Sequence, residues 1–200
     1  MGIDEDKRAT LRRFAAVGAA SPLVGLAGAS EGESEVRDAI AGYLTTTPGA
    51  HFSKLRDDLK LGTGESQHHL RRLLDDGVVE SYRDGDYRRF YPAGEFSDFQ
   101  KVVLGYLRRA TPSAMLVTLL RDPDATGGDL ADAADVSRGT VSKYAAELEN
   151  VGLLSREDGY ALTRPETVLT LVLRYADSFG PEAAALAREA DGLIRYEPTG

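Results

Sequence analysis

The stretch Leu61–Val79, LGTGESQHHLRRLLDDGVV, has a counterpart further along the chain in Val136–Leu154, VSRGTVSKYAAELENVGLL. The two stretches have few identical residues, but their apolar and glycine positions coincide. The same constant offset continues upstream without a gap, and a shared frame of this kind indicates two copies of one folding unit. The matched pairs are Ile40 and Met115, Leu44 and Leu119, Leu55 and Leu130, Leu61 and Val136, Gly64 and Gly139, Leu73 and Leu148, Gly77 and Gly152, and Val79 and Leu154.

The first copy, residues 34–93, has the periodicity of three helices followed by a hairpin. Thr47-Pro48-Gly49 ends the first helix, and Gly77 ends the third. Asp84-Gly85-Asp86 has the composition of a hairpin turn. The expected elements are a helix through Val36–Leu44, a short helix to Leu59 capped by Ser53, a third helix over about 65–76, and strands at 78–83 and 87–91.

The second copy, residues 111–163, repeats this order. We expect its helices to begin at Thr111-Pro112, at Thr126 or Asp129, and after a Ser137 cap, with a hairpin around Asp158-Gly159. A linker helix within residues 94–110 would join the copies, and two helices within 164–200 would follow. The predicted fold class is therefore mainly α with small β-hairpin wings (α+β), in two tandem domains.

Helix, helix, turn, helix and hairpin is the order of the winged helix-turn-helix. In that unit the third helix enters the DNA major groove and the hairpin, or wing, touches the adjacent backbone. The chain resembles archaeal, halophilic transcriptional regulators with tandem winged-helix domains of the ArsR and MarR types. The resemblance implies DNA binding over roughly residues 36–180, and it is carried by residues 47–52, Gly64, 68–73, 76–79 and 83–92 of the first copy and by 136–144, 147–148 and 152–154 of the second.

Two features of the first copy depart from this pattern. Ser66 stands where the family usually has an apolar residue, and Gly62 stands where it usually has a capping serine. Glu65, Asp75 and Asp76 would also repel phosphate, whereas the second copy keeps its cap at Ser137. We therefore expect the second recognition helix to read bases at least as much as the first.

The candidate DNA contacts are polar side chains on the two recognition helices and on the first wing. Arginine and lysine can reach guanine edges or phosphates, and glutamine can pair with adenine. The alternatives are a solvated helix face and, for the wing, pairing with Glu80, Asp84 and Asp86. The candidates are Arg138, Thr140, Ser142 and Lys143 in the second helix, Gln67, His68 and Arg71 in the first, and Arg83, Arg88 and Arg89 in the wing.

Composition excludes several kinds of chemistry. The chain has no cysteine, which removes disulfides, thiol nucleophiles and cysteine metal sites. We expect His51 and His69 to be structural, and we expect no metal, no cofactor and no enzymatic activity. The net charge is −8, with five lysines among 24 basic residues. This acidic, lysine-poor balance is typical of a protein from a very salty cytoplasm, where salt screens self-repulsion.

Residues 1–33 stand apart from the repeat. Arg12-Arg13 precedes an apolar run of small residues, which resembles a twin-arginine export signal. The other interpretations are a helix packed on the body, a flexible arm, and a membrane attachment through residues 8–29. A DNA-binding role favours a cytoplasmic location over export.

The apolar stripes at 96–107 and 168–176 either pack within the chain or form a homodimer seam. Two functions remain as alternatives to a DNA-binding regulator: a protein-docking module and a membrane-associated regulator.

Overall fold

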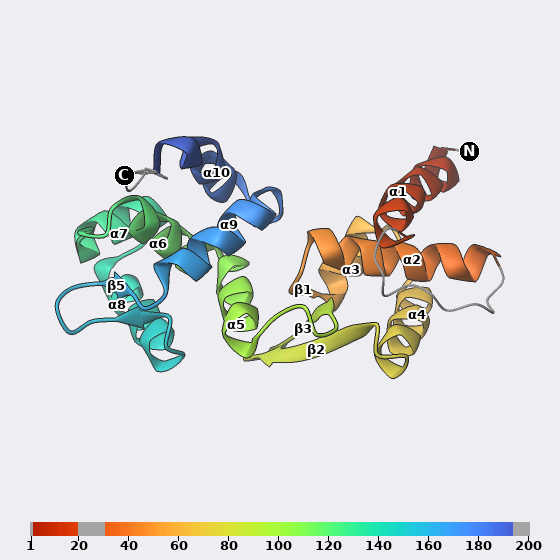
Figure 1. The fold of residues 1–200 in the computed structure, drawn as a ribbon, viewed down its shortest axis with the longest axis horizontal. Coiled ribbons are helices and arrows are strands. Elements are labelled where there is room, and N and C mark those ends of the chain that lie inside the picture. The colour runs from red at the N-terminus through yellow and green to blue at the C-terminus, as the bar shows by residue number, and fades with distance from the viewer. Residues whose placement is uncertain (1, 20–30, 194–200) are drawn as a thin grey trace, which may run out of the picture. The chain divides into compact units, whose positions relative to one another are not determined.

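The computed structural model describes residues 2–19 and 31–193, and its ribbon is drawn in Figure 1. The chain divides after Lys101 into two units, which we describe separately. The mainly helical fold with small antiparallel hairpins, expected from the sequence, is confirmed.

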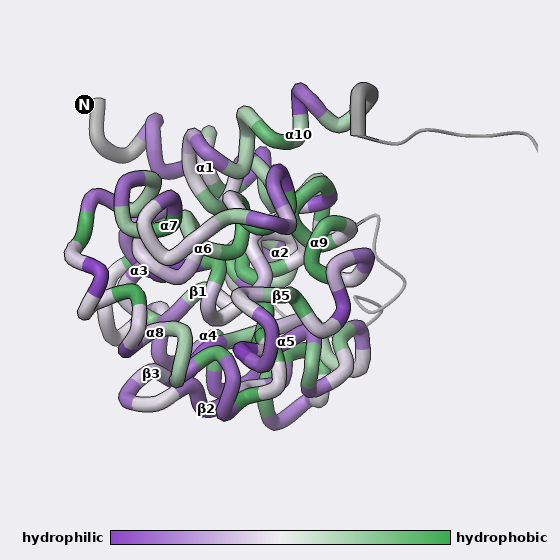
Figure 2. The backbone as a smooth tube through the Cα atoms, turned by 90° about the vertical axis from the view of Figure 1, so that its left-hand side faces the viewer, coloured by the Kyte–Doolittle hydropathy of each residue, from purple (hydrophilic) through white to green (hydrophobic). Residues whose placement is uncertain are grey.

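In its described residues the first unit holds the helices α1 (Gly2–Ala19), α2 (Glu31–Thr46), α3 (Phe52–Asp58) and α4 (Thr63–Asp75), ahead of the start of the linker helix. Helices α2, α3 and α4 show the periodicity of apolar residues seen in the sequence, because one face of each helix packs into the core. Ile40, Leu44 and Leu55 are fully buried. In Figure 2 the helices alternate between hydrophobic and hydrophilic residues along the tube, as amphipathic helices do.

A three-stranded antiparallel sheet completes this unit. Its strands β1 (Ala50–His51), β2 (Val79–Asp84) and β3 (Tyr87–Pro92) lie in the order β1-β3-β2. β3 is central, with Phe90 opposite Ala50 on one side and opposite Ser81 on the other. The sequence did not predict β1, because two residues are too short to show the alternation of a strand.

Two of the predicted helix caps are wrong. His51, not Ser53, is the N-cap of α3, and its Nδ1 accepts a hydrogen bond from the Lys54 N–H at 3.3 Å. The reason is that β1 runs directly into α3, so the helix begins earlier than a serine cap would allow. In the second unit α6 likewise begins at Ala110, with Arg109 as its N-cap, rather than at Thr111-Pro112.

The second unit repeats the element order of the first. The linker helix α5 (Asp98–Leu107) leads to α6 (Ala110–Arg121). At the offset of the sequence repeat, the start of α7 (Gly127–Ala134) matches that of α3, and both ends of α8 (Arg138–Asn150) match those of α4. The predicted Ser137 cap is confirmed, and Thr126, one of the two starts considered for the second helix, is the N-cap of α7. The remaining elements are β4 (Leu154–Ser155), β5 (Ala161–Leu162), α9 (Pro165–Phe179) and α10 (Pro181–Leu193).

The apolar stripes of α5 and α9 are buried within the single chain. Val103 and Leu107 of α5 are at most 1% exposed, and Val168 and Val172 of α9 are fully buried. The buried face of α9 centres on Val168, Leu171, Val172 and Tyr175, with the predicted Leu169 and Leu173 at its edge. These stripes therefore offer the predicted homodimer no open apolar seam.

Helix α1 lies outside the repeated unit and packs on α2. Leu11 is buried, and the Phe14 ring meets the Tyr43 ring edge-on at 5.3 Å. The helices approach closely because Gly18 and Gly42 have no side chains: a Cβ on Gly42 would lie 1.9 Å from the Phe14 carbonyl oxygen. Of the interpretations of residues 1–33, a packed helix describes 2–19, whereas 20–30 lie outside the described residues.

Among the residues that the structure describes, no helix is long and apolar enough to cross a membrane.

We expect Gly42→Ala to separate α1 from α2. The added methyl overlaps the Phe14 carbonyl, and overpacking of this kind costs about 1–3 kcal/mol. Chemical denaturation would measure the lower free energy of unfolding, and hydrogen exchange would show faster exchange in α1. Gly64→Ala is the matched control, because a Cβ added at Gly64 meets nothing within 4 Å. This variant should stabilise α4 by about 0.5–1 kcal/mol. Equal effects of both variants would contradict the close crossing.

We expect Ser66→Ala to stabilise the protein. Ser66 is fully buried, and its hydroxyl has no hydrogen-bond partner among the described residues. The equivalent position of α8 in the second copy is the buried Val141. Removing an unsatisfied buried hydroxyl should raise the free energy of unfolding by about 1 kcal/mol. Ser142→Ala, an exposed serine of α8, measures the gain from helix propensity alone. A gain at position 66 no larger than at 142 would show that the buried hydroxyl costs nothing.

Candidate nucleic-acid interface

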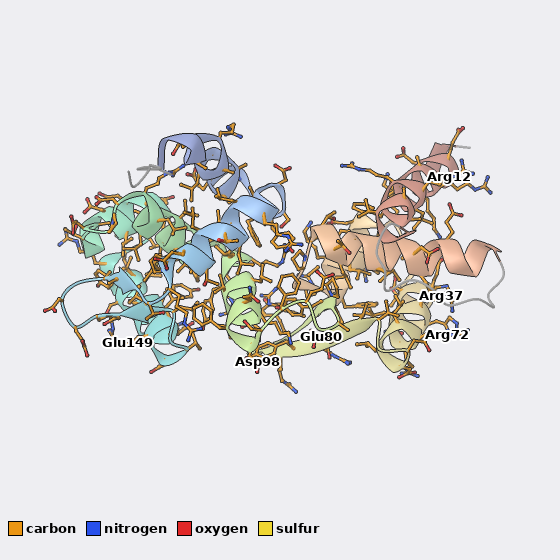
Figure 3. All side chains as sticks on the ribbon, in the orientation of Figure 1. Arg12, Arg37, Arg72, Glu80, Asp98 and Glu149 are labelled. Atoms are coloured by element: carbon orange, nitrogen blue, oxygen red, sulfur yellow. The ribbon has the colours of Figure 1, made fainter. Side chains whose placement is uncertain are left out.

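Helix α4 divides into a buried and an exposed side. Ser66, His69, Leu70 and Leu73 are buried, which agrees with a structural role for His69. The exposed side carries the three predicted contacts Gln67, His68 and Arg71. Arg72, labelled in Figure 3, lies beside Arg71 on the same helix. No cluster of metal-ligating side chains occurs in the described parts of the chain.

The carboxylate of Glu65, at the start of α4, is held by α1. Lys7 Nζ lies 2.9 Å from its Oε2, and the Gly62 N–H donates to the same oxygen at 3.2 Å. Burial raises the pKa of Glu65, but the hydrogen bonds from Lys7 and Gly62 outweigh it, so the pKa lies below its ordinary value. Lys7 therefore offsets a negative charge at the start of α4.

The β2–β3 hairpin presents two arginines side by side. Arg83 is directly opposite Arg88 in the strand register, and both side chains are exposed. Arg88 Nε donates to Ser81 Oγ at 3.0 Å, and its guanidinium lies 5.5 Å from the centre of the Phe90 ring. Neither arginine is paired with a carboxylate among the described residues. Two like charges opposite each other on a sheet repel, and a bound anion relieves that repulsion.

The prediction that Arg89 contacts DNA is wrong, because this side chain points into the unit and is only 2% exposed. Its Nε donates to Asp84 Oδ2 at 2.5 Å, and its Nη1 donates to the Gly49 carbonyl oxygen at 3.1 Å. The alternative of pairing within the hairpin therefore holds for Arg89 alone.

Glu80, another carboxylate that we considered as a wing partner, is directed elsewhere. Glu80 forms an ion pair with Lys101 at 3.0 Å, and Lys101 also approaches Asp98 at 3.7 Å; Figure 3 labels both carboxylates. The sequence also missed Tyr87 at the hairpin tip, which is 51% exposed and stacks at 5.7 Å on His51. Strand alternation puts Tyr87 on the face of Arg89, opposite to that of Arg88.

Helix α8 exposes three of its four predicted contacts. Arg138, Ser142 and Lys143 are exposed, whereas Thr140 is half-buried and its hydroxyl lies 3.0 Å from that of the capping Ser137. The Arg138 guanidinium lies against the start of α7, where a Cβ on Gly128 would be 3.0 Å from Nη2. Lys143 Nζ lies over the neighbouring Tyr144 ring at 5.8 Å.

The second hairpin differs in charge from the first. Its one arginine, Arg156, donates from Nε to Glu149 Oε2 at 2.8 Å, and this contact lowers the pKa of Glu149. Figure 3 labels Glu149 on α8. The tip carries the exposed Glu157 and Asp158. Within residues 154–162 there is thus no unpaired cation, which leaves the predicted backbone contact of this wing without support.

Comparison with known proteins places the helix-turn-helix character on the first unit and α5. Residues 34–104 match the family model described as HTH_HVO_0163_N, N-terminal HTH domain. Over 127 residues the chain is 28% identical to an uncharacterized HTH-type transcriptional regulator of Methanocaldococcus jannaschii. The aligned part is 63% of this chain but 32% of that relative's length. No solved structure matches. Both matches indicate a helix-turn-helix domain in this part of the chain.

We expect Arg83→Ala and Arg88→Ala to weaken DNA binding at low salt by reducing phosphate contacts. Each lost contact should lower the slope of log affinity against log salt by about 0.9. Titration of a labelled duplex with the full chain at several KCl concentrations measures this slope. Arg121→Ala is the control, because Arg121 pairs with Glu182 and Glu189 on α10. Unchanged slopes in both wing variants would show that the hairpin does not touch the backbone.

The Lys7–Glu65 pair should couple α1 to α4 in a pH-dependent way. The folded-state pKa of Glu65 is lowered from 4.5, so its stabilisation is present above that pH and is lost as the pH falls through the folded pKa. The pair is partly exposed, so a double-mutant cycle with Lys7→Met and Glu65→Gln should give less than about 1 kcal/mol at pH 7. This coupling should vanish in acid, once the pH has fallen below the folded-state pKa of Glu65, and a coupling that persists where Glu65 is protonated would not come from this ion pair.

Proposed function

We propose that this chain is a sequence-specific DNA-binding transcriptional regulator that uses two winged-helix domains. Recognition helices α4 and α8 enter the major groove, and the β2–β3 hairpin holds the backbone. The observation that carries the proposal is the unpaired, cross-strand Arg83 and Arg88 on the hairpin next to α4. Two neighbouring arginines without a carboxylate partner can both donate hydrogen bonds to phosphate oxygens.

In the first unit the base-reading residues are Gln67, His68 and Arg71. All three are exposed on α4, and Gln67 can pair with the N6 and N7 of adenine, while Arg71 suits guanine or a phosphate. The ion pair from Lys7 supports this role, because the positive charge of Lys7 offsets the negative charge of Glu65 at the start of α4.

In the second unit Arg138, Ser142 and Lys143 take the corresponding part, with Thr140 contributing to the helix cap. The hairpin of this unit is acidic, so we assign backbone contact to α8 itself. Since the stripes of α5 and α9 are already buried, the proposal is that one chain reads two adjacent sites with its own two units. The acidic, lysine-poor composition supports work at high salt.

The deciding experiment is selection of bound sequences from a random DNA pool with the full chain in KCl. We compare the parent protein with Arg138→Ala plus Lys143→Ala, with Gln67→Ala plus Arg71→Ala, and with Arg121→Ala as control. Each double variant should lose the half of the recovered motif that its own recognition helix reads, at about 1–3 kcal/mol per base contact. Loss of the whole motif in one double variant, with no change in the other, would show that one unit alone reads DNA. Failure of the parent protein to enrich any motif would overturn the proposal.

Protein docking is the second candidate, and the acidic hairpin with Glu157 and Asp158 is the observation that favours it. Salt separates the two functions, since binding to DNA weakens as salt rises, whereas an apolar protein interface holds or tightens.

A further inference from the structure

Helix α1 contacts the start of recognition helix α4, although α1 lies outside the repeated unit. Lys7 Nζ lies 2.9 Å from Glu65 Oε2, and Lys60 Nζ, in the turn before α4, lies 2.8 Å from Asp6 Oδ2. The side chains of Lys7 and Glu65 are 28% and 33% exposed, so water screens this contact only in part. Two neighbouring residues of α1 thus hold the α3–α4 turn and the first turn of α4.

The two recognition helices begin differently. Helix α8 has a side-chain cap of its own, since Ser137 Oγ accepts a hydrogen bond from the Thr140 N–H at 3.1 Å. Helix α4 has Gly62 at the corresponding position, and no side chain caps it. The Gly62 N–H instead donates to Glu65 Oε2 at 3.2 Å, the oxygen that Lys7 also contacts. The start of α4 therefore depends on one carboxylate, and a lysine of another helix holds that carboxylate.

The position of Lys7 is determined by the crossing of α1 and α2. Lys7, Leu11, Phe14 and Gly18 follow one another at the spacing of a single helix face. Leu11 is buried, and a Cβ on Gly18 would lie 2.3 Å from the Asp38 carbonyl oxygen. At a rise of 1.5 Å per residue, Lys7 is about 16 Å from Gly18 along the helix axis. The backbone contact with α2 at one end of α1 thus places Lys7 at the other end.

We propose that Lys7 is a positioning residue for the recognition helix. It holds Glu65, which fixes the first turn of α4, and the affinity of the first unit for DNA then depends on the docking of α1 on α2. The effect on DNA rests on the proposed function, whereas the ordering of α4 by α1 does not.

The first turn of α4 directly precedes residues that we propose to read bases. Gln67 and His68 follow Glu65 within one turn, so fraying of the first turn releases both side chains from their fixed positions. A Glu65 carboxylate without Lys7 also presents an uncompensated negative charge at the end of a helix that approaches phosphate. Both effects lower the affinity for DNA without any contact between Lys7 and the duplex.

The first measurement uses the full chain without DNA and follows amide hydrogen exchange by NMR. The Ser66 N–H donates to the Gly62 carbonyl oxygen at 2.9 Å and reports on the start of α4. The equivalent bond of α8, from the Val141 N–H to the Ser137 carbonyl oxygen at 3.1 Å, is the internal reference. Exchange at the start of α8 should be the same in all the variants, because α8 has its own cap.

Lys7→Met should speed the exchange of the Ser66 amide about twofold to fivefold, the range expected of a partly exposed ion pair. Lys7→Arg should not, because it keeps the charge. Arg12→Met is the matched control on the same helix: Arg12 is 78% exposed, lies 3.7 Å from Glu35 of α2, and is labelled in Figure 3. Exchange in Lys7→Met no faster than in Arg12→Met would overturn the proposal.

Gly62→Ser then tests whether Lys7 acts through the start of α4. The backbone at Gly62, with φ −68° and ψ 151°, suits serine, and an added Cβ has no neighbour closer than 3.8 Å. Serine gives α4 the local cap that α8 has. It should therefore slow exchange of the Ser66 amide more in the Lys7→Met background than in the parent protein. An equal gain in both backgrounds would show that Lys7 acts elsewhere.

DNA enters in the second measurement, with the duplex recovered by selection. Lys7→Met should lose about twofold to fivefold in affinity, and Gly62→Ser in the same chain should restore it. The slope of log affinity against log salt should stay unchanged, whereas a direct phosphate contact of Lys7 would lower it by about 0.9 and overturn the positioning role.

The two measurements separate this proposal from the proposed function. Exchange effects at the start of α4 in a protein that selects no DNA would refute the proposed function and leave the link between α1 and α4 standing. Selected DNA binding with the same exchange and affinity in Lys7→Met as in Arg12→Met would do the reverse.

Discussion

The first unit depends on the buried guanidinium of Arg89. A buried cation is tolerated only when its hydrogen bonds are satisfied, and Arg89 binds Asp84 of β2 and the Gly49 carbonyl ahead of β1. Because Arg89 itself lies on β3, this single side chain joins β3 both to β2 and to the residue that precedes β1. The pairing fixes the hairpin relative to the start of α3, and Phe90, the next residue, packs into the core. Removing either partner of such a buried pair typically costs about 3–5 kcal/mol.

The constraint on Arg89 also determines what the neighbouring arginines can do. Successive side chains of a strand point to opposite faces, so holding Arg89 inward on one face places Arg88 on the other, toward α4. Arg83 follows Arg88 because the two are opposite in register. Asp84, which directly follows Arg83 along the chain, is already bonded to Arg89. The cationic character of the hairpin is thus a consequence of the buried ion pair of the adjacent residue.

The sequence predicted the elements well wherever the signal was local and repeated. The constant offset between the two copies, the Thr126 and Ser137 caps and the ends of α4 and α8 all follow from glycine, serine and apolar positions. It failed at β1 and at the His51 cap, because a two-residue strand has no periodicity and a histidine cap is rare. The site was harder still. Lys7 and Glu65 are far apart along the chain, and nothing local in either segment shows that they meet.

Sequence could not rank the three wing arginines, since Asp84 and Asp86 both lie within five residues of each of them. Strand register determines which of the three arginines is buried. The two hairpins also differ in this respect. The first hairpin sends its buried arginine to Asp84 and leaves two arginines exposed; the second has only Arg156, which Glu149 holds, and ends in Glu157 and Asp158. The chain has a net charge of −8, but salt screens the interaction between exposed charges that lie more than about 10 Å apart. Attraction to an anion therefore depends on such local arrangements of cations and carboxylates. The acidic composition and a DNA-binding surface are therefore compatible, provided that the cations lie together and the nearest carboxylates are already bound.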